Sequence, residues 1–119
     1  AVVAAAVQTL LEDLARAPFA APDAARLSEL RLGPRELAAA ERAGALLRVT
    51  EGVVLAPGAP VAAREVLAGL PQPFTVSEAK AALGTTRRVA VPLLELLDRR
   101  GLTTRTSPDR RVVAAGASR

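Results

Sequence analysis

The strongest constraint on the fold is an internal repeat, in which one order of secondary-structure patterns occurs twice in 119 residues. The octapeptide ERAGALLR (residues 41–48) precedes DRRGLTTR (residues 98–105) by 57 positions, and an acid, two Arg and one Gly coincide. Both octapeptides fall where a helical pattern gives way to a strand pattern. The repeat predicts two copies of one small module.

The first half is predicted to contain three helices and a hairpin. Apolar residues at three- and four-residue steps indicate a helix over residues 2–17, which Pro18 ends. A short helix follows over 23–30. Pro34 opens a third helix, which Gly44 closes. Two further segments are typical of the strands of a hairpin, residues 46–49 and residues 53–55.

The second half is predicted to repeat this order after the uncharged, Pro- and Gly-rich boundary APGAPVA. The expected helices cover residues 62–70, 75–83 and 87–100, and the expected strands cover residues 102–106 and 110–114. Thr75 and Glu78 form a capping-box pattern, and Thr85 or Thr86 caps the third helix. The predicted class is mostly α with small β-hairpins (α+β), arranged as two tandem winged-helix domains, 1–58 and 59–119.

Composition argues against several function classes. The sequence has no Cys and no His, so it lacks thiolate metal ligands and the commonest general base. It contains no phosphate-binding loop motif and no apolar run of membrane-spanning length. We therefore expect a cytoplasmic fragment that is not an enzyme, carries no cofactor or metal and has no membrane partner.

Charge is divided unevenly between the halves. Residues 1–60 hold six Arg against seven acids, a net charge of −1, whereas residues 61–119 hold ten Arg and Lys against five acids, a net charge of +5. A basic half favours an acidic partner, and nucleic acid is the usual one.

The basic residues of the second half are placed around one helix and the wing that follows it. In the helix over 87–100, the apolar stripe faces inward, while Arg87, Val91, Glu95 and Asp98 are predicted to face outward. Arg87 and Arg88 lie in the first turn, where cations are disfavoured unless an anion joins them. The predicted phosphate-binding residues are Thr85, Thr86, Arg87 and Arg88, flanked by Lys80, Arg105, Arg110 and Arg111.

Other charged residues fit ordinary helix surfaces. Arg99 and Arg100 lie in a last helical turn, where they complement the helix dipole. In the first half, Arg35 and Glu36 alternate as on a solvated helix face. The first domain is therefore predicted to be accessory or to position the second.

Residues 74–113 resemble the last winged-helix domain of the bacterial selenocysteine-specific elongation factor family, SelB. The matching motifs are Gly84-Thr85-Thr86-Arg87-Arg88, Pro92-Leu93-Leu94-Glu95 and Asp98-Arg99-Arg100-Gly101-Leu102-Thr103-Thr104-Arg105. Thr86 and Arg88 replace the family's Ser and Lys, which keeps a hydroxyl and a charge. The wing turn, Ser107-Pro108-Asp109, is one residue longer than the family's.

The resemblance implies a fragment that binds an mRNA hairpin, the selenocysteine insertion element, near the ribosome. It also implies that GTPase and tRNA-binding domains belong to the full-length chain, which recruits selenocysteyl-tRNA to UGA. The residues alone leave two other functions open: a DNA-binding winged helix of a transcription regulator, and a protein-interaction module.

Overall fold

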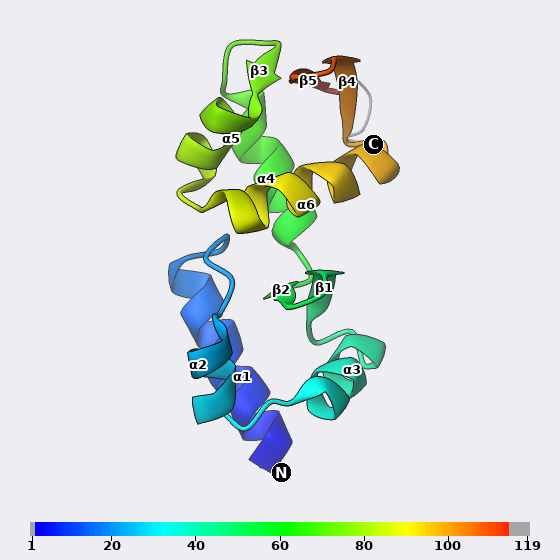
Figure 1. Cartoon of the computed structure of the whole chain (residues 1–119). Coiled ribbons are helices and arrows are strands. Elements are labelled where there is room, and N and C mark those ends of the chain that lie inside the picture. Colours follow the sequence, from blue (N-terminus) through cyan, green and yellow to red (C-terminus); the bar gives the residue numbers. More distant parts are fainter. Residues whose placement is uncertain (1, 115–119) are drawn as a thin grey trace. The chain divides into compact units, whose positions relative to one another are not determined.

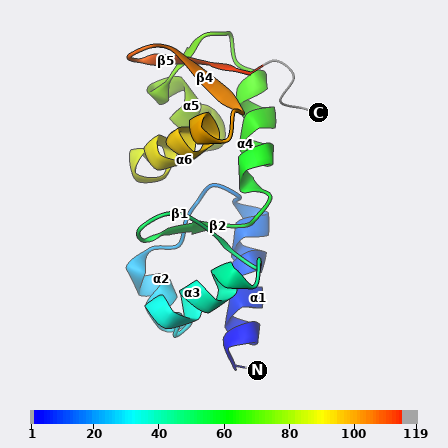
Figure 2. The same cartoon turned by 90° about the vertical axis from the view of Figure 1, so that its right-hand side faces the viewer.

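The computed structural model describes residues 2–114, and the chain divides into two compact units, Ala1–Pro57 and Gly58–Arg119. Both units are mainly helical, and each carries a small antiparallel sheet (Figures 1 and 2). The predicted α+β class is therefore confirmed. None of the described helices is long and apolar enough to cross a membrane.

The first unit follows the predicted order of elements closely. It comprises α1 (Val2–Arg16), α2 (Ala24–Glu29), α3 (Pro34–Arg42), β1 (Leu47–Thr50) and β2 (Val53–Leu55). Pro34 stands in the first turn of α3, where its missing N–H removes no helical hydrogen bond. The strands pair antiparallel with Leu47 opposite Leu55. Both strands bury apolar side chains, so the hairpin packs its apolar side into the unit.

A charged pair links α1 to α2. Arg26 Nε donates to Asp13 Oδ2 at 2.8 Å, and Arg26 Nη2 donates to Asp13 Oδ1 at 3.3 Å. The hydrogen bond from Arg26 holds the pKa of Asp13 below its ordinary value of 3.8. Because the pKa of Asp13 is lower in the folded state, the pair stabilises the unit fully at pH values above the ordinary pKa of this side chain. That contribution is lost as the pH falls through the lowered pKa.

The chain leaves α2 through a left-handed residue that is not glycine. Arg31 has φ of 58°, and the turn is closed by hydrogen bonds from Arg31 N–H to Ser28 O and from Leu32 N–H to Leu27 O. At the ends of α3 and α6 (Arg87–Arg99), Gly44 and Gly101 take this conformation. A side chain with a Cβ is disfavoured there by roughly 1 kcal/mol.

We expect Arg31→Gly to raise the free energy of unfolding of the first unit by about 0.5 to 1 kcal/mol, because it removes this strain. Urea denaturation followed by circular dichroism measures the change. Ala39→Gly, at an exposed site inside α3, is the matched control and should lower stability by about 1 kcal/mol. If the Arg31→Gly variant is less stable than the parent chain, contacts of the Arg31 side chain contribute more than the backbone strain costs.

The second unit departs from prediction at its first helix. Its elements are α4 (Ala59–Ala68), β3 (Phe74–Thr75), α5 (Val76–Leu83), α6, β4 (Thr103–Ser107) and β5 (Arg110–Val113). Helix α4 begins three residues earlier than predicted, inside the expected boundary segment. Pro60 lies in the first turn, where proline fits a helix, so it does not mark the end of a linker.

The second unit also contains a strand that was not predicted. Strand β3 pairs with β5, with Phe74 opposite Arg111 and Thr75 opposite Arg110, and the sheet order is β3-β5-β4. Two residues are too few for an alternating pattern. Thr75 also caps α5: its Oγ1 accepts from Glu78 N–H at 3.2 Å, and its own N–H donates to Glu78 Oε1 at 2.8 Å. The predicted capping box is confirmed.

Helix α6 is the centre of the second core. Its predicted inward stripe is confirmed as buried, and the stripe comprises Val89, Ala90, Leu93, Leu94 and Leu97. The helix continues through Pro92 to Arg99. Because α6 is anchored along one whole side, its first turn and the residues of its outer side are held in fixed positions.

Candidate nucleic-acid interface

The start of α6 presents a helix terminus with two arginines. Thr86 is the N-cap residue, but its side chain makes no capping hydrogen bond. Arg87 and Arg88 follow in the first turn and are exposed, and that turn contains no acidic residue. Backbone N–H groups of a first helical turn point toward the N-terminal end of the helix. In α6, one of them, Val89 N–H, donates to Thr86 O at 3.1 Å. The local chemistry therefore suits an anion.

A hollow of about 320 Å³ lies beside this terminus, between α6, the β3–α5 junction and the wing formed by β4 and β5. Its lining comprises Thr75, Val76, Ser77, Arg87, Val91, Glu95, Arg105, Pro108, Asp109 and Arg111. The fold thus brings Arg87 and Arg105, eighteen positions apart in sequence, to one depression. Glu95 and Asp109 add negative charge, so the hollow favours a ligand with both donors and acceptors.

The wing residues differ in how firmly they are held. Arg105 Nη2 donates to Pro108 O at 3.0 Å across the turn, which orients an exposed guanidinium. Ser107 Oγ donates to Asp109 Oδ1 at 3.0 Å and stiffens the same turn. Arg110 is exposed at the start of β5. Of the remaining predicted residues, Lys80 and Thr85 are half-buried, and neither lines the hollow.

The structure argues against the prediction that Arg111 contacts RNA, because its side chain is only 4% exposed. Its Nε donates to Asp98 Oδ1 at 3.1 Å and to Oδ2 at 3.0 Å. Asp98, predicted to face outward, instead turns toward β5 and also accepts from Thr103 Oγ1 at 2.6 Å. Thr103 is buried as well. Sequence periodicity on α6 cannot reveal this network, because the partners lie on strands whose pairing is set by the tertiary fold.

Gln72 is a second residue that sequence reasoning missed. Its Nε2 donates to Leu67 O at 3.0 Å and to Leu70 O at 2.8 Å, and its Oε1 accepts from Val113 N–H at 2.8 Å. One amide therefore joins the end of α4 to the end of β5. In the sequence, only the position of Gln72 between Pro71 and Pro73 distinguishes it. That position does not predict which groups its side chain hydrogen-bonds.

Comparison with known families gives a match over residues 65–113, to the family described as elongation factor SelB, winged helix. That range contains the α6 terminus, the wing and the hollow. Over these residues the second unit is similar to the winged-helix domain of that family. No curated protein matches the chain.

Two solved structures extend the comparison. A bacterial selenocysteine-specific elongation factor, EF-Sec, matches 89% of this chain with 26% identity and a TM-score of 0.68. The match covers 18% of that protein, so the chain spans under a fifth of its length. The mRNA-binding domain of elongation factor SelB from E. coli, solved in complex with SECIS RNA, matches 92% of this chain and 97% of its own length. At 17% identity and a TM-score of 0.63, this second likeness shows a shared fold.

Proposed function

We propose that the second unit binds an mRNA stem-loop of the selenocysteine insertion type. The observation that carries this proposal is the pair of exposed arginines, Arg87 and Arg88, at the start of α6, beside a hollow that Arg105 also lines. The E. coli SelB domain that shares this fold was solved with SECIS RNA. A phosphate at the α6 terminus accepts from backbone N–H groups, a Thr hydroxyl and a guanidinium together.

The proposed recognition relies on backbone shape and on one unstacked base. The sequence has no Trp and no Tyr, and Phe19 and Phe74 are both buried, so the aromatic platform used by many single-strand binders is missing. The hollow is at the small end of the range for ligand pockets. A base extruded from the stem-loop would enter it and stack against a guanidinium plane.

The proposed contact set differs from the sequence-based one in a single residue. Arg87, Arg88, Thr85 and Thr86 contact phosphate, and Lys80, Arg105 and Arg110 flank the RNA. Arg111 borders the hollow but is left out of the phosphate contacts, because its guanidinium is 4% exposed and pairs with Asp98. It fixes the wing against α6 and acts on RNA binding only through that position.

In the full-length protein, the proposed role is to hold the mRNA hairpin while GTPase and tRNA-binding domains deliver selenocysteyl-tRNA to a UGA codon on the ribosome. The first unit, with its near-neutral charge, is proposed to be an accessory domain that positions the second. Arg35 and Glu36 stand side by side in its α3, and no basic pair like that of α6 occurs there.

Fluorescence anisotropy tests the proposal with a labelled hairpin taken from downstream of an in-frame UGA in the source organism's own mRNA. A scrambled stem-loop and duplex DNA are the competitors, at two salt concentrations. We expect selective binding that weakens with salt by about 0.7 to 0.9 logarithmic units per phosphate contacted and per tenfold salt. Equal competition by duplex DNA would support a DNA-binding winged helix instead, and no binding would reject both.

A further inference from the structure

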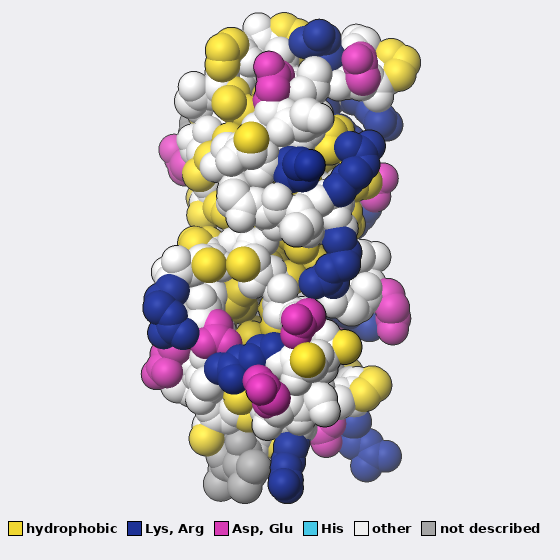
Figure 3. Space-filling view, turned by 60° about the vertical axis from the view of Figure 1, so that its left-hand side comes forward, with side chains coloured by type: hydrophobic (Ala, Val, Ile, Leu, Met, Phe, Trp, Pro, Cys, Tyr) yellow, Lys and Arg dark blue, Asp and Glu magenta, His cyan; other side chains and the backbone are white. Residues whose placement is uncertain are grey.

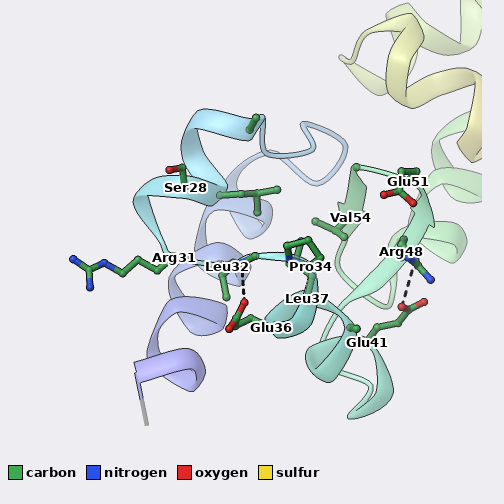
Figure 4. A pocket seen from close by; sticks show the side chains of 15 residues that line it. Ser28, Arg31, Leu32, Pro34, Glu36, Leu37, Glu41, Arg48, Glu51 and Val54 are labelled. Carbon is green, nitrogen blue, oxygen red and sulfur yellow. Dashed lines mark hydrogen bonds and ion pairs between the residues drawn. The ribbon is translucent and has the colours of Figure 1, made fainter.

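The first unit contains a larger hollow, of about 660 Å³, between α2, α3 and the hairpin (Figure 4). It occupies the place that the smaller hollow occupies in the second unit, next to the last helix and the wing. Its chemistry is different. Leu27, Leu32, Leu37, Ala38 and Val54 supply an apolar lining, and Leu27, Leu37 and Ala38 are partly open to solvent.

The turn before α3 lacks the features that suit a phosphate in the second unit. When the two helices are aligned at their N-cap residues, Gly33 of α3 corresponds to Thr86 of α6. The residues on either side of the N-cap are Leu32 and Pro34 in the first unit and Thr85 and Arg87 in the second. Glu36 Oε1 accepts from Gly33 N–H at 3.0 Å, so a carboxylate already occupies the helix terminus. An RNA phosphate would meet a negative charge and no hydroxyl there.

The charged residues that line the hollow are three Glu and two Arg, a net charge of −1. Glu41 pairs with Arg48, whose Nε lies 3.4 Å from Glu41 Oε1. The Arg31 side chain extends away from the hollow, and Glu51 lies at its hairpin edge (Figure 4). Glu51 is exposed, with no salt bridge among the described residues. Acidic and basic side chains also stand close together on the face of the first unit in Figure 3, around exposed apolar atoms.

From these observations we infer that this hollow docks an amphipathic helix of a partner protein, with Leu-like side chains in the apolar lining and Lys or Arg beside Glu51 and Glu36. The volume accommodates several large aliphatic side chains, as in helix-in-groove recognition. The negative rim selects a basic partner segment and disfavours nucleic acid. The partner is distinct from the RNA proposed for the second unit, so either inference can fail without the other.

The test uses the full 119-residue chain, labelled with ¹⁵N, and two helical probe peptides of about 15 residues with Leu at i, i+3, i+4 and i+7. One peptide carries Lys at its remaining positions, and the other carries Glu. We expect the Lys peptide to shift the amide resonances of Leu27, Leu37 and Glu51, and the Glu peptide to bind at least about threefold more weakly.

Two charge reversals locate the binding. Glu51→Lys should weaken binding of the Lys peptide by about three- to tenfold and strengthen binding of the Glu peptide. Glu12→Lys, an exposed reversal on α1 outside the hollow, is the matched control and should change neither affinity by more than about twofold. Shifts that map elsewhere, equal binding of both peptides, or displacement of the Lys peptide by the RNA hairpin would overturn the inference.

Discussion

Asp98→Ala is expected to lower the free energy of unfolding of the second unit by about 3 kcal/mol. The substitution leaves the Arg111 guanidinium, 4% exposed, without its carboxylate, and an uncompensated buried charge is costly. It also removes the acceptor of Thr103 Oγ1. Because the Asp98 side chain is 26% exposed, the loss lies at the lower end of the range for buried pairs. Urea denaturation of the full chain measures it.

Matched variants separate charge burial from lost packing. Thr103→Val removes one hydrogen bond at nearly constant side-chain volume and should lower the free energy of unfolding by about 1 kcal/mol. The double variant Asp98→Leu with Arg111→Met removes both charges and should recover most of the stability lost in Asp98→Ala. A double variant as unstable as the single one would show that packing, and not the unpaired charge, dominates.

Arg87→Ala is expected to weaken binding of the mRNA hairpin by about 1 to 3 kcal/mol, the range for hydrogen bonds to charged groups. This corresponds to roughly a 5- to 150-fold increase in Kd. Arg87 is exposed, so the substitution should leave the thermal unfolding midpoint nearly unchanged. Anisotropy titrations of the variant and the parent chain measure the effect.

Arg99→Ala is the matched control, because it removes the same charge from the other end of the same helix. It should change the affinity by less than a factor of about three, since long-range charge effects are screened. The salt slope should fall by about 0.7 to 0.9 in Arg87→Ala and stay constant in Arg99→Ala. Equal losses in the two variants would show that net charge alone, and not the α6 terminus, attracts the RNA.

Much of the fold was predictable because it depends on local patterns. The capping box at Thr75 and Glu78 and the proline that opens α3 act within one turn of chain, and both were predicted correctly. The inward stripe of α6 follows from helical spacing alone. The start of α4 was predicted three residues too late, because Pro60 suits both a linker and a first helical turn.

The exposure of the charged residues could not be predicted from local sequence patterns. Arg110 and Arg111 are neighbours in sequence, yet one is exposed and the other is buried against Asp98. Successive residues of a strand point to opposite faces, so only the register of β5 against β3 and β4 decides which arginine faces solvent. Spacing alone gave no reason to separate them.

The sequence by itself determined the order of the helices and the two hairpins, the basic character of the second half and the placement of Arg87 and Arg88 in a first helical turn. Each of these depends on neighbours within a few residues, whereas strand β3 was recognisable only from its pairing with β5. Only the tertiary structure decided which charged groups pair and which side chains share a hollow. It placed Arg105 beside Arg87 and turned Asp98 toward Arg111. Those outcomes depend on strand register and on packing between elements distant in sequence, which residue spacing does not record.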